Sequence, residues 1–273
     1  MTPALEIEDL NIRFAQAPEP ALANFNLRVA RGEIVGLVGE SGSGKTLAGS
    51  SILRLEPAGA DFRATRLAVD GVDMLAASAA ARQNLRGARA ALIFQEPAAA
   101  LSPVRRIGDQ ICDVLHRHER LSHRAAREKA VALLADMQIE APQAVFGRYP
   151  FELSGGMCQR VLIAMAFAGR PALIVADEIT TAIDAELRVA ILDLLLRHAR
   201  AIGAAIVFIS HDLGLVSRIC SRVLVLRRGR VVEEGLTAQV LSHPADPYTR
   251  MLLAALPDRS PPDTHQPVTE AVA

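Results

Sequence analysis

A glycine-rich loop between a buried strand and a helix is the feature that most constrains the fold. Ile34–Val38 is a continuous apolar run that ends at Gly39, and Leu47–Leu55 follows as a predicted helix. Between them, residues 39–46 read Gly-Glu-Ser-Gly-Ser-Gly-Lys-Thr, which matches G-x-x-x-x-G-K-[ST] in full. The flanking strand and helix are the context that this motif requires. A plain glycine-rich turn is the weaker interpretation.

The loop predicts phosphate binding. Glycines let backbone N–H groups wrap phosphate oxygens, Lys45 reaches the β and γ oxygens, and the Thr46 hydroxyl can ligate Mg²⁺. The predicted triphosphate-binding residues are Gly39, Glu40, Ser41, Gly42, Ser43, Gly44, Lys45 and Thr46. The motif says little about what the nucleotide drives.

The remaining apolar runs predict a mostly parallel α/β core. Short runs typical of buried strands are separated by longer helical patterns, which favours a parallel sheet flanked by helices. These runs are Ala90–Phe94, Ala172–Ala176 and Ala204–Ile209. Leu5–Phe14 and Phe25–Val29 alternate apolar and polar residues, as half-buried antiparallel strands do. Val223–Leu226 and Val231–Glu234 indicate a final hairpin.

Two segments lie outside this alternation of strands and helices. Residues from about Pro97 to Arg148 are rich in Ala, Arg, Leu and His, with apolar residues at helical spacing, and predict a helical insertion. Beyond Pro257 the chain is polar and Pro-rich, which predicts a disordered tail. The Ala-rich stretch Ala76–Ala81 is explained by an ordinary helix.

Composition is that of a globular protein. The 273 residues are 51% hydrophobic and 22% charged, and 30 basic residues balance 30 acidic ones, so global charge gives no support for nucleic-acid binding. The apolar runs are far shorter than the roughly 20 residues that span a bilayer. No secretory signal is visible, and three widely spaced cysteines suit a reducing compartment. We therefore expect a cytoplasmic location.

An acidic pair follows one of the predicted buried strands. Ala172–Ala176 leads directly into Asp177 and Glu178. A carboxylate at such a strand end can hold the Mg²⁺ water shell, and its neighbour can polarise an attacking water. Asp177 suits the first role and Glu178 the second. On its own, such a pair is more often a helix cap or a solvated turn.

A second potential anion site lies downstream. Leu153–Arg160 reads Leu-Ser-Gly-Gly-Met-Cys-Gln-Arg and opens into the apolar run Val161–Ala168. Ser154 is a candidate N-cap, and Gly155 and Gly156 leave backbone N–H groups uncovered at the positive end of a helix. Either both sites bind one ligand, or the second serves a nucleotide held by another chain.

The order and spacing of these motifs resemble those of ATP-binding cassette (ABC) ATPases over roughly residues 4–257. The resemblance implies a P-loop core with an antiparallel β-subdomain and an inserted helical subdomain (about 97–160), leaving 258–273 as a tail. It also implies roles for Gln95 (a glutamine that also approaches the metal), His211 (a switch histidine at the γ-phosphate), Asp184 (the D-loop) and Phe14 (stacking on adenine).

In that family, two such subunits pair head to tail. The resemblance implies that Ser154, Gly155, Gly156 and Gln159 contact ATP bound by a second ABC ATPase subunit, a paralogue or another copy. ATP and Mg²⁺ are the implied cofactors. Further implied partners are two membrane permease subunits and, indirectly, an external solute-binding protein, with this chain peripheral at the cytoplasmic face of the inner membrane.

Two positions depart from the usual family pattern. Ile179 follows the acidic pair where proline is usual, and Ile183 stands where leucine is usual. Losing the proline frees a backbone angle and restores one N–H, so we expect looser placement of Glu178 and an altered rate at most. A regulatory subunit with weak catalysis is the corresponding alternative.

The C-terminal segment narrows the branch. His243–Leu253 is similar to the H-P-x-x-P-Y-T-x-x-L-L element of oligopeptide, dipeptide and nickel importers, although by itself it is a turn and an amphipathic helix. We therefore expect an importer of peptides, nickel or a metallophore-like solute. The spacing of His116, His118 and His123 does not predict a nickel site. A soluble ABC protein acting on nucleic acid or ribosomes is the alternative.

Overall fold

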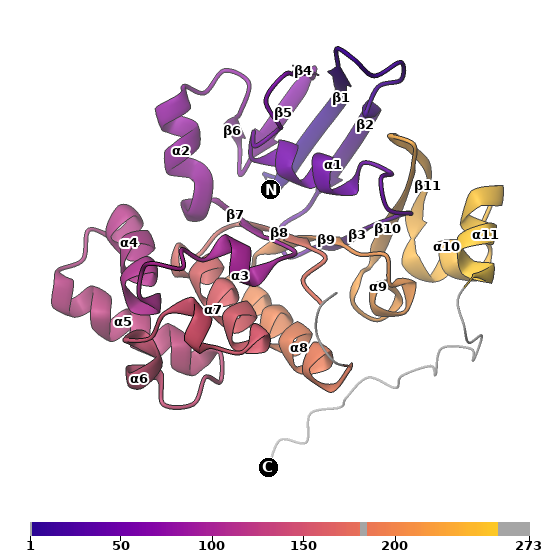
Figure 1. Cartoon of the computed structure of the whole chain (residues 1–273). Coiled ribbons are helices and arrows are strands. Elements are labelled where there is room, and N and C mark those ends of the chain that lie inside the picture. The colour runs from indigo at the N-terminus through magenta and orange to yellow at the C-terminus, as the bar shows by residue number, and fades with distance from the viewer. Residues whose placement is uncertain (1, 181–184, 256–273) are drawn as a thin grey trace.

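The structure, a computed structural model, describes residues 2–180 and 185–255, and a six-stranded sheet forms its centre (Figure 1). The strands lie in the order β11 (Arg230–Leu236), β10 (Arg222–Arg227), β3 (Ile34–Val38), β9 (Ala205–Ile209), β8 (Leu173–Asp177) and β7 (Ala90–Ile93). All neighbours are parallel except the β10–β11 hairpin. The predicted parallel core and final hairpin are confirmed.

A second, antiparallel sheet packs over the first. It consists of β1 (Leu5–Phe14), β2 (Leu22–Val29), β4 (Ala60–Arg63), β5 (Arg66–Val69) and β6 (Val72–Asp73). The β1–β2 pairing confirms the antiparallel strands expected from alternation. Strands β4 to β6 were not predicted, because segments of two to four residues are too short to show a period.

The helices differ from the predictions mainly at their ends. Their bounds are α1 Lys45–Ile52, α2 Ala79–Ala88, α3 Pro97–Ala100, α4 Ile107–Glu119, α5 His123–Asp136, α6 Pro142–Phe146, α7 Gly155–Ala168, α8 Ala185–Ile202, α9 Leu213–Ile219, α10 Thr237–Ser242 and α11 Pro247–Ala254. Helix α1 ends before Leu55, because Arg54 takes a left-handed φ of 54°. Helix α2 begins only after Ser78, whose side chain caps it, so the prediction of helix from Ala76 was wrong.

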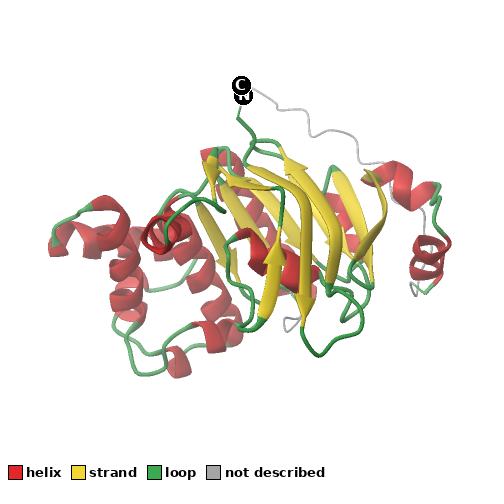
Figure 2. Cartoon of the chain, turned by 90° about the horizontal axis from the view of Figure 1, so that it is seen from above, coloured by secondary structure: helices red, strands yellow, loops and turns green. Residues whose placement is uncertain are grey.

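Alternate residues of the central strands enter two different apolar cores. On β9, Val207 and Ile209 face α1 and the antiparallel sheet, whereas Ile206 and Phe208 face the core that contains α7 and α8. The central sheet is therefore buried on both faces, as its apolar strands require. Helices α4 to α6 gather to one side of the two sheets (Figure 2). No helix within residues 2–180 or 185–255 has the length and apolar character that a membrane span needs.

Candidate functional site

The predicted catalytic motifs meet at one edge of the central sheet. Strands β3, β9, β8 and β7 are parallel neighbours, so their carboxyl ends share one edge. The glycine-rich loop follows β3, His211 follows β9, Glu178 follows β8 and Gln95 follows β7. Ligands of open α/β sheets bind at this edge. The fold thus brings together residues that are up to 172 positions apart in the chain (His211 minus Gly39).

The glycine-rich loop is buried at Gly39, Ser43 and Lys45, whereas Glu40, Ser41 and Gly42 are exposed. The Lys45 ammonium is 4% exposed and donates to the carbonyls of Gly39 and Glu40, each at 2.8 Å. Burial lowers the pKa of Lys45, although the nearby carboxylates of Glu178, Asp177 and Glu40 oppose this shift. Gly39 has a φ of 149°, and a Cβ there would lie 2.1 Å from the Leu226 carbonyl oxygen, so only glycine fits.

Oxygen ligands for a cation adjoin the loop. The Thr46 hydroxyl lies 3.3 Å from Asp177 Oδ1, at the start of α1 and the end of β8 respectively. Burial raises the pKa of Asp177, partly offset by the Thr46 hydrogen bond. The Ser43 hydroxyl is buried and has no hydrogen-bond partner among the described residues. A hydroxyl, a carboxylate and an unsatisfied buried oxygen fit a phosphate-bound Mg²⁺.

Gln95 and His211, two of the predicted catalytic residues, both contact the third, Glu178. Gln95 Nε2 donates to Glu178 Oε2 at 3.3 Å, and His211 Nδ1 lies 3.3 Å from the same oxygen. The Glu178 side chain is 16% exposed, and the residue has a left-handed φ of 46°. A carboxylate held in this way can accept a proton from water.

Ile179, the departure from the family pattern, packs in the core next to Glu178. Its side chain is 1% exposed within the cluster that contains α7 and α8. Ile179 is therefore an apolar anchor in the core beside Glu178. Its effect on the rate stays a prediction.

The second predicted anion site is an exposed helix end. Helix α7 begins at Gly155, and Ser154 is its N-cap, accepting a hydrogen bond from the Met157 N–H at 3.3 Å. Among the residues that the structure describes, none outside its own helix and chain neighbours lies within 4 Å of a Cβ placed on Gly155, whereas a Cβ on Gly156 would lie 2.4 Å from the Leu187 side chain. Gly156 thus also serves packing against α8. The N-cap and helix start are confirmed.

Gln159 lies in a different environment from the rest of its motif. Its side chain is completely buried, unlike the exposed Ser154 and Gly155. In this arrangement the Gln159 amide faces the protein interior, so the exposed end of α7 consists of Ser154, Gly155 and Gly156. Any contact of Gln159 with a partner's nucleotide would require this end of α7 to rearrange.

The remaining predicted site residues are Phe14, which lies on the antiparallel sheet, and Asp184, which the structure does not describe. Phe14 is half-buried at the end of β1 and packs on the core between the sheets. Near this end of β1, Ile12 pairs with Leu22 of β2. The Leu22 side chain in turn lies close to the glycine-rich loop, because a Cβ placed on Gly44 would be 3.0 Å from it. Asp184 and Ile183 lie outside the described residues, as does the segment after Ala255.

The histidines of the helical segment do not gather into one site. The His116 and His123 rings contact edge to face, with centroids 4.9 Å apart, while His118 borders a groove. Burial lowers the pKa of His118. Groups of three potential metal ligands are absent from the described part of the chain.

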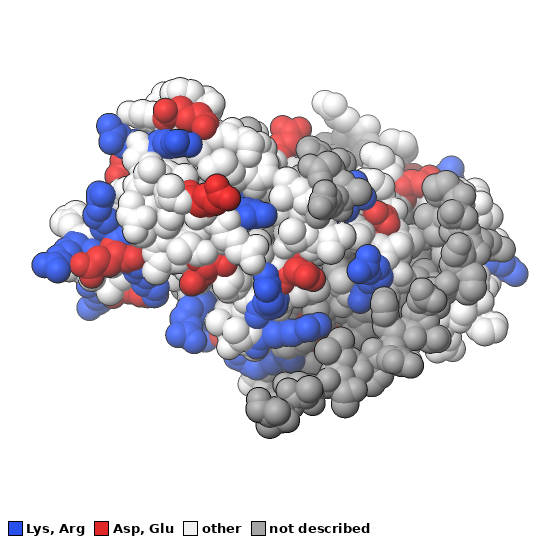
Figure 3. All heavy atoms as spheres, turned by 90° about the horizontal axis from the view of Figure 1, so that it is seen from below, with Lys and Arg blue, Asp and Glu red and all other residues white. Residues whose placement is uncertain are grey.

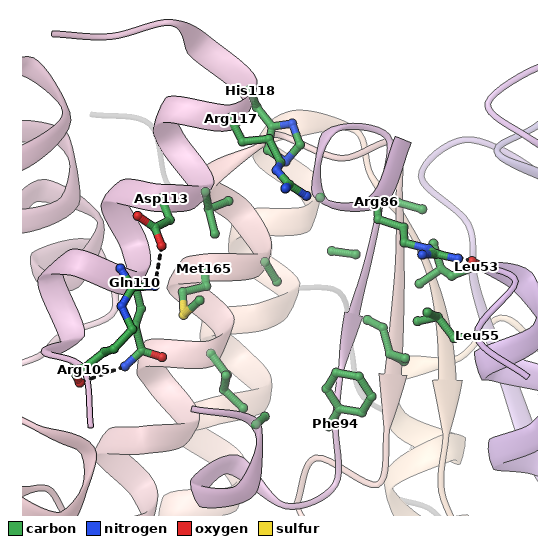
Figure 4. Close-up of a pocket in the computed structure, with 18 residues that line it drawn as sticks. Leu53, Leu55, Arg86, Phe94, Arg105, Gln110, Asp113, Arg117, His118 and Met165 are labelled. Atoms are coloured by element: carbon green, nitrogen blue, oxygen red, sulfur yellow. Dashed lines mark hydrogen bonds and ion pairs between the residues drawn. The ribbon is translucent and has the colours of Figure 1, made fainter. Parts of the chain in front are cut away.

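This groove, of about 530 Å³, lies between β7 and helices α4 and α7 (Figure 4). Leu55 and Phe94 contribute exposed apolar surface on one side and Met165 on the other, and Phe94 is 48% exposed. Arg86, Arg105 and Arg117 stand at its margin. Sequence reasoning missed the groove because its walls come from segments distant in the chain. The sequence signal that could have pointed to the groove was the aromatic residue Phe94 beside Gln95.

Comparison with known families decides the identity of this fold and site. The family model described as ABC transporter matches residues 22–181, more than half of the chain. The chain belongs to the ABC transporter family. It is accordingly an ATP hydrolase of the kind that is coupled to transport, and the matched region contains the glycine-rich loop, the acidic strand end and the α7 motif.

Relatives of similar sequence are transport ATP-binding proteins. The chain is 47% identical to the probable D,D-dipeptide transport ATP-binding protein DdpD of Escherichia coli (strain K12), over 97% of this chain and 86% of that protein. It is 39% identical to the oligopeptide transport ATP-binding protein OppD of Bacillus subtilis (strain 168), over 94% and 73%. It spans only 42% of the glutathione import ATP-binding protein GsiA of Salmonella choleraesuis (strain SC-B67), with 41% identity.

Solved structures agree with this assignment. The dimeric ATP-binding cassette MJ0796 in a post-hydrolysis state with ADP and Pi superimposes with a TM-score of 0.75 at 26% identity, covering 85% of this chain and 98% of that one. Charge offers no support for the nucleic-acid alternative: basic and acidic side chains are interspersed over the described part of the face in Figure 3. The relatives' names do not favour it either.

Proposed function

We propose that this chain is the ATP-hydrolysing subunit of an importer for peptides or a similarly small solute. The convergence of Gln95 and His211 on Glu178 is the observation that carries the catalytic part. The solute class is supported by the relatives named for D,D-dipeptide and oligopeptide transport and by the His243–Leu253 element. Nickel or a metallophore is the remaining option from the sequence.

In the proposed reaction, Lys45 and the backbone N–H groups of the loop bind the β and γ phosphates of ATP. Thr46 and Asp177 would hold Mg²⁺, with Gln95 beside them, and the ion when bound neutralises phosphate charge. Glu178 accepts a proton from the attacking water, while His211, at the same carboxylate, binds the γ-phosphate. Phe14 stacks on the adenine ring.

A complete site requires a second ABC ATPase subunit, either another copy or a paralogue. Helix α7, which begins at Gly155 and Gly156 with Ser154 as its N-cap, lies on the opposite face of the central sheet from α1 (Figure 1). The dimeric state of the similar cassette MJ0796 supports pairing. Each subunit then contributes its α7 end to the partner's ATP. The family resemblance implies the same interface for Asp184, which lies outside the described residues.

The groove of Figure 4 is the proposed docking site for a permease subunit at the cytoplasmic face of the membrane. Its apolar walls suit the apolar face of a helix. Of the arginines at its margin, Arg105 is paired with Asp113 and Arg86 donates to the Leu53 carbonyl, so Arg117 is the one that suits an acidic residue beside that face. Phe94 in the groove adjoins Gln95, whose amide binds Glu178. Movement of a docked helix that displaced Phe94 would therefore also displace Gln95, and with it the hydrogen bond to the Glu178 carboxylate.

The test is co-purification with candidate permease subunits of peptide importers. Wild-type chain should form a complex, and Phe94→Asp should remove most of it by placing a charge in the apolar groove, while ATP binding by the isolated chain is retained. Leu236→Asp is the matched control, because Leu236 is 63% exposed at the end of β11, away from β7. Failure to bind any permease of this class, or equal loss with both variants, contradicts the proposal.

A further inference from the structure

The C-terminal segment His243–Leu253 contacts the phosphate-binding loop directly. The hydroxyl oxygen of Tyr248, on α11, accepts a hydrogen bond from the Glu40 N–H at 3.0 Å, across 208 positions of sequence. The Glu40 carbonyl in turn accepts from Lys45 Nζ at 2.8 Å. This loop residue is therefore held at its N–H by Tyr248 and at its carbonyl by the phosphate-binding lysine.

Tyr248 is itself held firmly. Its side chain is 3% exposed, and the Arg227 guanidinium lies 4.7 Å from its ring centroid. Its N–H donates to Asp246 Oδ1 at 2.7 Å, which caps the start of α11. The N–H groups of Ala245 and Asp246 donate to the Glu233 carboxylate on β11, at 2.8 and 3.1 Å. The hydroxyl position is thus fixed by the central sheet through these contacts.

The β10–β11 turn holds the other part of the same loop. The Gly229 N–H donates to the Ser43 carbonyl at 2.9 Å. Gly229 has a φ of 75°, and a Cβ there would lie 2.5 Å from the Ala21 carbonyl oxygen. Between the two attachments is a cavity of about 240 Å³, bordered by Ser41, Arg228 and Met251 among others. The loop is therefore bordered by open space between its two attachments.

We propose that Tyr248 is a positioning residue for nucleotide binding, whose hydroxyl holds the loop in the conformation that receives the triphosphate. The inference rests on phosphate binding by residues 39–46. A loop ordered before binding loses less conformational freedom when ATP binds, and this raises affinity. Without the hydroxyl, the Glu40 N–H loses its partner, and the loop samples other conformations. The His243–Leu253 element thereby acquires a physical role in the nucleotide site.

The experiment compares Tyr248→Phe with wild type. Phenylalanine keeps the ring under Arg227 and removes only the hydroxyl, so one hydrogen bond is lost, equivalent to about three- to tenfold weaker binding. We expect that loss in the affinity of the full chain for a fluorescent ATP analogue. In the assembled transporter, KM for ATP should rise while kcat at saturating ATP stays within about twofold. Tyr149→Phe removes the hydroxyl of the chain's only other tyrosine and is the control.

A measurement on the unaltered sequence covers the case in which Tyr248→Phe loses stability. With two tyrosines in the chain, 3-fluorotyrosine labelling gives two ¹⁹F NMR signals, assigned through the two Phe variants. The Tyr248 signal should shift on addition of MgATP, and should not shift in Lys45→Ala. Unchanged affinity in a folded Tyr248→Phe, a fall in kcat alone, or an unmoved Tyr248 signal at saturating ATP overturns the inference. Normal ATP binding by Lys45→Ala would instead contradict the proposed phosphate site itself.

Discussion

The two helix ends that bind anions in the proposed site differ in how far this chain completes them. At α1, Lys45 and Ser43 are 4% and 5% exposed, and the loop is attached to α11 and to the β10–β11 turn, although its residues 40–42 are exposed. At α7, Ser154 and Gly155 are exposed, and a Cβ placed on Gly155 would meet none of the other described residues within 4 Å beyond its own helix and chain neighbours. The first end is shaped by its own chain before ATP arrives. The second would be completed, in the proposed dimer, by the partner's nucleotide.

The largest effect, on ATP affinity, should follow from removing the charge of Lys45 at the α1 end. Lys45→Ala removes the buried ammonium that reaches the phosphates and also holds the carbonyls of Gly39 and Glu40. We expect tight ATP binding to be abolished in the isolated chain, measured by titration with a fluorescent ATP analogue. Ser154→Ala, at the open end, should bind ATP as wild type does in the same assay. Wild-type affinity in Lys45→Ala would remove the basis for calling the α1 end the site that binds ATP in the single chain.

The second largest effect is expected at the proposed general base, Glu178, which lies beside the α1 end. Glu178→Gln keeps the shape and the contacts available to Gln95 and His211 but cannot accept a proton from water. We predict a fall in ATP turnover of the assembled transporter on the order of 10²–10⁴-fold. ATP binding should be retained, and this separates the variant from Lys45→Ala. Unchanged turnover would show that another group is the general base.

The same two regions show what could be predicted from this sequence. The order of strand, loop and helix at the α1 end was predicted, with helix bounds off by two or three residues, because these segments are contiguous and each has a local pattern. Tyr248 was identified only as part of a family element, since its contact with Glu40 joins residues 208 positions apart. No periodicity or spacing encodes such a tertiary contact.

Helix α7 illustrates a second limit. It packs against α3, α4, α5, α8 and β7, so apolar residues surround most of it and no single face is marked by hydrophobic period. The N-cap Ser154 was predictable from its local chemistry, whereas the burial of Gln159 depends on which neighbours cover that side of the helix. Strands β4 to β6 were missed for a related reason, because β4 and β5 pair with β1, distant in sequence, and β6 is only two residues long.

The smallest of these effects is expected at the open end. Gly155→Asp adds a negative charge at the first position of α7, where open space admits the side chain and the helix dipole favours an acid, so folding should be retained. Facing a partner's phosphates, the same charge is repulsive. We expect ATP-dependent pairing, followed by light scattering with a Glu178→Gln background, to weaken by about tenfold or more. ATP binding by the single chain should not change.

Gly155→Asn is the matched control for this prediction, because it has nearly the same size and no charge. If Asn and Asp weaken pairing equally, bulk rather than charge is responsible, and the partner's phosphates do not lie at this end of α7. If Gly155→Asp instead weakens ATP binding in the single chain, both helix ends act on one nucleotide. The proposal that the α1 end binds the chain's own ATP while the α7 end contacts the partner's ATP would then be wrong.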